Sequence, residues 1–388
     1  MLSAEDFMRE FDHATSISSA QGFAMLEKLR PRGSILVEAI LALGHARLGQ
    51  MALAQTHARS MADAMTKREM DACRPKNTVL VLCELRPAKL IISNDRIRIE
   101  SGHNNVPSLM KESGFDVVHV WPHQVSMDTL AVVAEAAVAV INCYSEADED
   151  GVWNLADFQG RRLMNSPQAV RRSRRDRISS ALAHIDPQVY EVPRTRKWKS
   201  RPANLSSGSI LARKLNSHSG YGLKLLSSER EIADVQIGEF AYITEYVDTR
   251  WSDGLFRKFR AIHARGNTVV EHLLISDHWC VRSASARRFM ACDPARQLEE
   301  LKFIACWRDS HPNIETLMWE IVRATGLDYF IADIGLKPDG HLVLFEANPA
   351  GRIILESELA EEGFHLKENV FAVRDMFKRQ VIAHGREH

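Results

Sequence analysis

The spacing of apolar and polar positions changes along the chain. In SILVEAILALGHARLGQMALAQTHARSMADAMTKREMDAC, residues 34–73, apolar and small residues recur at steps of three and four, which predicts two helices in a hairpin. From residue 77 the runs TVLVLCEL, FDVVHVW and AVAVINCY, typical of buried parallel strands, alternate with helix-like segments such as VPSLMKESG and MDTLAVVAEA. This alternation predicts an open α/β sheet over residues 77–165.

The pattern changes again after Ser166 and Pro167. Serine can cap a helix and proline is tolerated at its first position, so this pair predicts the start of a helix over QAVRRSRRDRISSALAHI. The runs SILARKL, YGLKLL, FAYITEYV, FRKFRAIHA and NTVVEHLLI then predict short antiparallel strands. We expect a helical region at 1–74, an α/β domain at 75–168 and a third part at 169–388.

The helical region at 1–74 has two interpretations. LGHARLGQMALAQ resembles a tetratricopeptide helix pair, but no second copy of about 34 residues follows, and such repeats need about three copies to be stable. We expect a helical cap or dimerisation arm. A repeat-type groove that binds a peptide is the alternative.

Composition narrows the class of protein. Of the 388 residues, 45% are apolar and 26% charged, and 50 Lys plus Arg balance 50 Asp plus Glu, so no overall charge attracts nucleic acid or an anionic membrane. No uncharged apolar run is long enough to span a bilayer, and the N-terminus does not resemble a signal peptide. The six cysteines lack CxxC spacing, which argues against zinc sites and a disulfide framework. We expect a cytoplasmic protein that binds neither nucleic acid nor a membrane.

The segment DIGLKPDGHLVLFEANPAG places polar side chains on strand-like sequence. Its Asp339 and Gly340 are a strong signal for a β-hairpin. If these two residues form the whole loop, Asp333 lies directly opposite Glu346. A type I turn with a glycine bulge would instead shift Asp333 out of this register by one residue.

Convergence of Asp333, Glu346 and Asn348 would form a metal site. Glu346 and Asn348 are two residues apart and share one face of a strand. Two neighbouring carboxylates raise each other's pKa unless a cation neutralises them. Magnesium prefers oxygen ligands and binds through one or two carboxylates together with substrate phosphates. The alternative is that these polar residues occupy strand ends and a solvated loop.

Two further segments carry groups that suit a nucleotide. In LARKLNSHSGYGLKLL the glycines allow backbone N–H groups to approach an anion, and Arg213 or Lys214 supplies positive charge. In AYITEYV a strand edge offers hydrogen bonds to adenine, and Arg257, Lys258 and Arg260 follow on the next strand. An ordinary turn and a solvated basic face are the alternatives.

Taken in order, these segments resemble the ATP-grasp superfamily of carboxylate–amine ligases, especially the branch of glutathione synthetase and the ribosomal-protein glutamate ligases. The resemblance covers roughly residues 77–375. It implies an ATP-grasp fold, in which an open α/β domain is followed by two α+β subdomains that clasp ATP. The small lid subdomain would span about 175–245 and the large one about 246–388.

The resemblance also assigns residues. FEANPAG is similar to the family's Glu-x-Asn-Pro signature, which implies Asp333, Glu346 and Asn348 as ligands of magnesium, with manganese as an alternative ion. Arginine stands at two positions where the family usually has a lysine, and it keeps the charge but presents a planar fork. The residues implied to bind ATP are Arg177, Arg213 or its neighbour Lys214, Ser217, His218, Ser219, Gly220, Glu245, Tyr246 and Val247.

The implied reaction joins a small-molecule or peptide carboxylate to an amine. The carboxylate attacks the γ-phosphate of ATP to give an acylphosphate and ADP, and the amine then displaces phosphate. Arg213 and Arg260 are expected to neutralise the growing charge. Lys258, Arg282 and Arg352 are candidates for holding the acceptor. Alternatives are a phosphotransferase of the same fold and a nucleotide-binding regulatory protein; the N-terminal helices could bind a partner or a second copy of the chain.

Overall fold

The computed structural model describes most of the chain beyond residue 34. The described residues are 35–47, 49–72, 74, 77–83, 90–93, 96–99, 105–121, 134–135, 137–144, 163–198, 208–214, 222–235 and 240–387. Within these ranges no helix is both long enough and apolar enough to cross a membrane.

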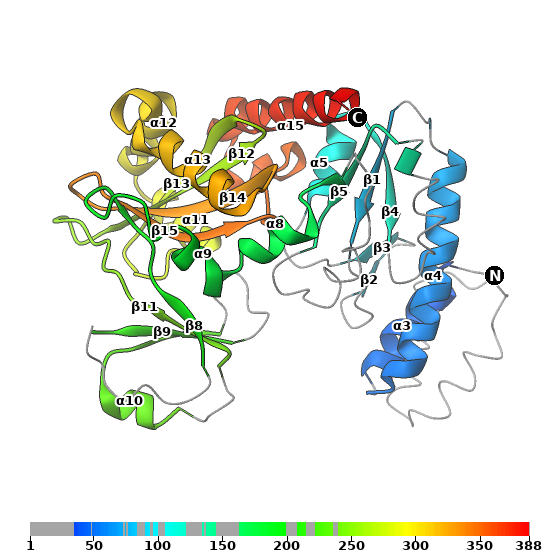
Figure 1. Ribbon diagram of the computed structural model, residues 1–388, viewed down its shortest axis with the longest axis horizontal. Helices are drawn as coiled ribbons and strands as arrows, with labels where there is room; N and C mark the ends of the chain where they lie inside the picture. Colours follow the sequence, from blue (N-terminus) through cyan, green and yellow to red (C-terminus); the bar gives the residue numbers. More distant parts are fainter. Residues whose placement is uncertain are drawn as a thin grey trace.

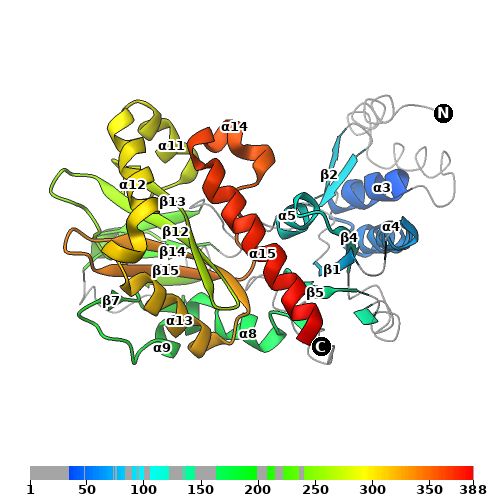
Figure 2. The same ribbon diagram turned by 90° about the horizontal axis from the view of Figure 1, so that it is seen from above.

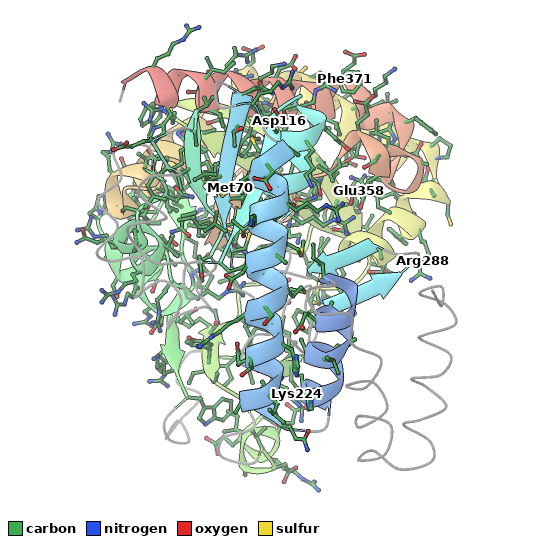
Figure 3. The ribbon with its side chains drawn as sticks, turned by 90° about the vertical axis from the view of Figure 1, so that its right-hand side faces the viewer. Met70, Asp116, Lys224, Arg288, Glu358 and Phe371 are labelled. Atoms are coloured by element: carbon green, nitrogen blue, oxygen red, sulfur yellow. The ribbon has the colours of Figure 1, made fainter. Side chains whose placement is uncertain are left out.

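The predicted helical hairpin is present in the described part of the N-terminal region. Helix α3 spans Ile35–Arg47 and α4 spans Met51–Ala72. Small buried residues allow the two helices to pack closely, namely Ala39, Ala42, Ala58 and Ala62. Figure 3 shows α4 running lengthwise over the outer side of the neighbouring sheet, next to α3. The hydroxyl of Thr66 donates to the carbonyl oxygen of His119 at 2.8 Å, so the hairpin is tied to that sheet.

The predicted α/β sheet has four parallel strands in the order β4-β1-β5-β6. The strands are β1 (Thr78–Leu82), β4 (Asp116–Val120), β5 (Ala139–Asn142) and β6 (Leu163–Met164), with α5 at Val106–Glu112. A separate hairpin of β2 (Leu90–Ser93) and β3 (Arg96–Ile99), which the sequence pattern did not predict, lies next to α3. Most of the predicted helix MDTLAVVAEA lies outside the described residues.

The helix predicted after Ser166 and Pro167 is two helices, so the prediction of one continuous helix is wrong. As expected, the Ser166 side chain accepts a hydrogen bond from the backbone N–H of Ala169 at 3.2 Å. Helix α8 spans Pro167–Arg172 and α9 spans Arg175–Ala181. Arg174 between them is extended, at φ −55° and ψ 143°, and the Ser173 hydroxyl bonds the carbonyl of Val170.

The predicted antiparallel strands form two sheets. The small sheet has the order β10-β9-β11-β8. It comprises β8 (Thr195–Lys197), β9 (Ile210–Arg213), β10 (Leu223–Leu226) and β11 (Tyr242–Glu245), with α10 at Glu229–Ala233. The large sheet has the order β13-β12-β14-β15-β7. It comprises β7 (Tyr190–Glu191), β12 (Phe256–Ala264), β13 (Asn267–Ser276), β14 (Tyr329–Leu336) and β15 (Leu342–Asn348).

Helices cover the large sheet and connect it to the parallel sheet. The helices and short turns are α11 (Ser283–Ala291), α12 (Pro294–Ser310), α13 (Asn313–Thr325), η3 (Glu356–Glu358), α14 (Leu359–Glu362), η4 (Phe364–Leu366) and α15 (Lys367–Glu387). Figure 2 shows α15 extending from the large sheet to β5. Its Val373 and Phe377 share one buried cluster with Val81 and Ile141, so the two parts have a common core.

The parts follow one another in the order that the ATP-grasp resemblance predicts. A parallel α/β sheet comes first, then a small antiparallel sheet, then a large one flanked by helices (Figure 1). The small sheet faces one side of the large sheet in Figure 1. The predicted fold class is confirmed by this arrangement of sheets.

Candidate functional site

The hairpin that carries the predicted metal ligands turns through a longer loop than two residues. The backbone N–H of Lys337 donates to the carbonyl of His341 at 3.0 Å, and Leu336 pairs with Leu342. Gly340 has φ +83°, the left-handed conformation that a type I turn with a glycine bulge requires. The prediction of a two-residue loop is therefore wrong, and the alternative, a type I turn with a glycine bulge, is observed.

A second irregularity restores the register of the carboxylates. Ile334 pairs with Leu344, whereas Asp333 pairs with Glu346. Phe345 is thus an extra residue on β15, a β-bulge. The longer loop shifts the ladder by one residue and the bulge shifts it back. Asp333 and Glu346 are directly opposed, as predicted, although for a different reason.

Asn348 completes the set of three oxygen-bearing side chains. It is two residues beyond Glu346 on β15 and pairs with Ile331, two residues before Asp333. All three side chains therefore lie on one face of the sheet. The Asn348 side-chain oxygen accepts the backbone N–H of Ala350 at 2.8 Å, and an amide oxygen has a second lone pair for another partner.

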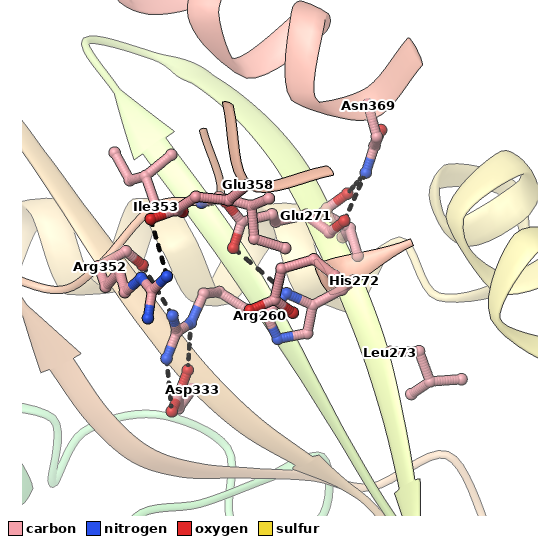
Figure 4. A network of polar contacts seen from close by, with 12 residues as sticks. Arg260, Glu271, His272, Leu273, Asp333, Arg352, Ile353, Glu358 and Asn369 are labelled. Carbon is pink, nitrogen blue, oxygen red and sulfur yellow. Dashed lines mark hydrogen bonds and ion pairs between the residues drawn. The ribbon is translucent and has the colours of Figure 1, made fainter. Parts of the chain in front are cut away.

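Two cationic side chains on β12 hold Asp333. Arg260 donates through Nε to Oδ1 at 2.7 Å and through Nη2 to Oδ2 at 3.1 Å (Figure 4). Lys258 Nζ lies 3.0 Å from Oδ2. Burial favours the neutral acid, but the charges of Arg260 and Lys258 outweigh it and hold the pKa of Asp333 far below its ordinary value. Asp333 is therefore ionised in the folded protein.

Glu346 is held by an arginine that the sequence analysis did not select. Arg175, at the start of α9, forms an ion pair with its carboxylate. Burial raises the pKa of Glu346, but the charges of Arg175 and Arg213 contribute to a net lowering. Arg177, selected from the sequence, is exposed. Periodicity could not reveal the break between α8 and α9 that brings Arg175 to the site.

The small sheet brings a second part of the predicted nucleotide site to the same place. Arg213 ends β9 and is half-buried, and its charge acts on Glu346. Lys214 follows it and is exposed, with its backbone N–H donating to the carbonyl of Gly222 at 3.1 Å. The predicted phosphate-loop residues Ser217, His218, Ser219 and Gly220 lie outside the described residues.

The predicted adenine-binding segment ends β11. Glu245, Tyr246 and Val247 are all half-buried, and Glu245 Oε1 accepts a hydrogen bond from Nε of Arg194 at 2.7 Å. The ring of Tyr246 meets the ring of Trp279 edge-on, with centroids 6.0 Å apart. Trp279 was not predicted; it belongs to the loop after β13, and no local signal places it beside Tyr246.

An exposed aromatic ring lies beside the carboxylates. Phe345, the bulge residue, is 40% exposed. A side chain added at Gly335 would lie 2.7 Å from Cζ of Phe345 and 3.0 Å from Cγ2 of Thr249, so the absence of a side chain there lets the ring approach the backbone of β14 closely. The sequence offered no signal for this ring, because the bulge that turns it to this face was not foreseen.

The remaining candidates lie around this face. Arg352 is exposed, its Nη2 donates to Oε1 of Glu358 at 2.8 Å, and its carbonyl oxygen accepts from Nη1 of Arg260 at 2.7 Å. Arg282 is the half-buried residue that precedes α11. Lys258 is already engaged by Asp333. Lys258 therefore contacts Asp333 directly, and Arg352 is linked to Asp333 through Arg260.

The donor set fits a hard divalent cation bound with phosphate. Two ionised carboxylates and an amide oxygen share one face, which is the ligand chemistry that magnesium prefers. More cations than carboxylates act here, so the face also suits a strongly anionic ligand. The side chains whose charge acts on the two carboxylates are Arg175, Arg213, Lys258 and Arg260.

Comparisons with known proteins give similarities only among solved structures. No family model and no curated protein matches the chain. A RimK domain protein ATP-grasp from Sphaerobacter thermophilus is 15% identical, with 76% of this chain and 97% of that chain covered and a TM-score of 0.41. The macrocyclase MdnC of Microcystis aeruginosa, bound with precursor peptide MdnA, is 12% identical, covering 79% and 99%, with a TM-score of 0.44. Carboxyaminoimidazole ribonucleotide synthase from Aspergillus clavatus, complexed with ATP, is 12% identical, covering 78% and 77%, with a TM-score of 0.43. Similarities at this level do not identify a function.

Proposed function

We propose that the protein is an ATP- and magnesium-dependent ligase that joins a carboxylate to an amine through an acylphosphate. The observation that carries this proposal is the placement of Asp333, Glu346 and Asn348 on one face of the large sheet, surrounded by an excess of cationic side chains. A site with both features suits a metal ion and a polyphosphate together. The order of the three sheets, which agrees with the ATP-grasp resemblance, supports the same proposal.

Each part of the face has a role in this proposal. Asp333, Glu346 and Asn348 would hold the magnesium ion, which when bound neutralises phosphate charge. Lys258 and Arg175 pair with these carboxylates and lie beside the same face, where they can contact phosphate oxygens. Arg213 approaches from the small sheet and is expected to bind the same phosphates.

The purine would lie between residues 245–247, at the end of β11, and the large sheet. The backbone at Tyr246 and Val247 offers hydrogen-bonding groups at the end of β11. Phe345 presents an exposed aromatic surface on the large sheet. An apolar ring beside a few polar groups is the usual chemistry of a site for a flat ligand.

The reaction has two displacements. An oxygen of the substrate carboxylate attacks the γ-phosphorus of ATP, and ADP leaves. The nitrogen of the amine then attacks the carbonyl carbon of the acylphosphate, and phosphate leaves. Arg260, which bonds both Asp333 and the Arg352 carbonyl, is held in one orientation and is expected to neutralise negative charge that grows in both steps.

The test uses the full chain with ATP, magnesium and a mixture of the twenty amino acids. The proposal predicts release of ADP and a condensation product whose mass is the sum of two reactants minus water, found by mass spectrometry. Both signals should be lost in Glu346→Gln and kept in Asp339→Asn, an exposed control on the same hairpin. A phosphorylated compound without condensation would favour a phosphotransferase. Equal ADP release by Glu346→Gln would contradict the site.

A further inference from the structure

A second irregularity in the large sheet places two buried titratable residues beside Arg260. Arg260 on β12 pairs with His272 on β13, but the next residue, Ala261, pairs with Val270. Glu271 is therefore the extra residue of a β-bulge. Its exposed fraction is 0% and that of His272 is 2%. Figure 4 shows Arg260 between Asp333 and this pair.

Two polar atoms of this cluster, His272 Nε2 and Arg287 Nη2, have no hydrogen-bond partner within the described part of the chain. Among the described residues, Glu271 Oε2 and His272 Nδ1 face only each other. A buried polar group without a partner destabilises the folded state. Such atoms are unusual in a folded protein, in which almost all buried polar groups are paired. Buried polar atoms without partners are expected where the side chains take part in the chemistry of a site.

The Glu271 carboxylate is fixed and directed at the imidazole ring. Its Oε1 accepts the backbone N–H of Ile354 at 2.7 Å, and its Oε2 lies 3.2 Å from Nδ1 of His272. A carboxylate beside Nδ1 favours the tautomer with the proton on Nδ1. The lone pair of Nε2 is then free to accept a proton.

The environment determines where a proton on this pair resides. Burial raises the pKa of Glu271 to about 7, with Arg260 and Arg287 opposing this effect and Glu362 adding to it. Near neutral pH, Glu271 can therefore both take up and release a proton.

Burial lowers the pKa of His272 well below its ordinary value, and neighbouring positive charges add to this effect. An acquired proton therefore comes to rest on Glu271 rather than on the ring. The charged groups that face the pair from the elements packed around it are Arg260 and Lys258 on β12, Asp333 on β14, Arg287 on α11 and Glu362 on α14.

We propose that His272 and Glu271 accept the proton that the attacking amine loses, an inference that rests on the proposed ligase function. Directly opposed residues on antiparallel strands have Cβ atoms about 4.5–5.5 Å apart, so His272 adjoins Arg260 on the face assigned to the reaction. The chain at residues 352–354 is tied to Arg260 and Glu271 by one hydrogen bond each. Arg260 bonds the carbonyl of Arg352, and Glu271 bonds the N–H of Ile354.

The proton balance of the step is complete. An amine arrives as an ammonium ion at neutral pH, and Nε2 of His272 takes one of its protons while the Nδ1 proton passes to Oε2 of Glu271. The nitrogen lone pair forms the bond to the carbonyl carbon, and the C–O bond breaks with its electrons leaving on phosphate. The second proton lost by the nitrogen goes to phosphate. Glu271 then returns its proton to Nδ1 of His272 while Nε2 releases its proton to water, which restores the starting tautomer.

The test separates attack by an amine from formation of the acylphosphate. Hydroxylamine is largely unprotonated at pH 7, needs no base and converts acylphosphates to hydroxamates, which are measured with ferric ion. Wild type, Glu271→Gln and His272→Asn are assayed with ATP, magnesium and the twenty amino acids, with and without hydroxylamine. General-base catalysis is worth about 10²–10⁴-fold, so amide formation should fall at least about 100-fold in both variants while hydroxamate formation stays within about threefold.

The control variant is His263→Asn, which also replaces a buried histidine on the same pair of strands, three residues from Arg260 along β12 and thus on the opposite face of the sheet. His263 is 0% exposed and bonds Thr268. It should leave the ratio of amide to hydroxamate unchanged. Thermal unfolding of each variant reports whether it folds.

The pH profile gives a second readout. In wild type the rate of amide formation should rise with pH and level off near pH 7, whereas in Glu271→Gln the rise should continue toward the pKa of the amine itself. Equal losses of amide and hydroxamate, or unchanged amide formation, would overturn the inference and leave the ligase proposal intact. A wild type that forms no hydroxamate would instead contradict the proposed function, and the inference would fall with it.

Discussion

Replacement of Asp333 by asparagine tests how the site is held before any ligand binds. Asp333 accepts two hydrogen bonds from Arg260 and one from Lys258. The Asp333→Asn variant keeps the shape of the side chain but leaves both cations without their counter-charge. Arg260 is 16% exposed at its side chain and Lys258 15%, so water compensates only in part.

The expected cost is that of breaking a buried ion pair by removing one partner, about 3–5 kcal/mol. Because a chain of several domains does not unfold in one transition, hydrogen exchange of peptides from β12 and β14 is the suitable assay. Asp339→Asn on the exposed loop of the same hairpin is the control and should change protection by less than about 0.5 kcal/mol.

The stabilisation that Asp333 contributes should depend on pH in a defined direction. Since the pKa of Asp333 is depressed below 3.8, its stabilisation is complete above that pH and is lost as the pH falls through the lower, folded-state pKa. The difference between wild type and Asp333→Asn should therefore shrink in strong acid. Equal exchange protection of the two proteins at pH 7 would refute the assignment of Asp333 as the anion that holds these cations.

Three further changes are expected to have defined effects. Gly335→Ala should displace the Phe345 ring, cost about 1–3 kcal/mol and weaken ATP binding measured by calorimetry; unchanged affinity would argue against Phe345 as the purine surface. Gly385→Ala places a Cβ against the carbonyl oxygen of Val138, so exchange protection in α15 should fall by about 1–3 kcal/mol, and unaltered protection would contradict this close packing. Glu271 has a folded-state pKa raised from 4.5 to about 7, so the hydrogen-exchange protection of β13 peptides in wild type should fall by about 3 kcal/mol as the pH rises between these values; parallel pH profiles of this protection in wild type and Glu271→Gln would contradict this titration.

The alternation of residues predicted most of the strands but not their partners. FRKFRAIHA and NTVVEHLLI form β12 and β13, as expected. In the sheet, β12 lies between β13 and β14. The pairing of β12 with β14 joins segments about 70 residues apart, and local spacing of residues does not encode it. The division of the antiparallel strands into two sheets came from the family resemblance rather than from periodicity.

The site shows where sequence reasoning stops. Asp333 and Glu346 are opposed because a longer loop and the bulge at Phe345 cancel, and neither irregularity changes the alternation that the sequence displays. Arg175 was missed because a two-residue break between helices rotates α9, an effect of the Ser173 hydroxyl and the extended Arg174. In each case a local deviation from ideal geometry decides which side chain reaches the site.

The central claim is that Asp333, Glu346 and Asn348 bind a nucleotide together with a metal ion. Calorimetric titration of ATP into the full chain, with magnesium and with excess chelator, tests it most directly. We predict binding that requires magnesium and is weakened at least about tenfold by Glu346→Gln and by Asn348→Ala, since each removes one oxygen ligand of a site with few ligands. ATP binding of equal strength in the presence of chelator, or in both variants, would contradict the account.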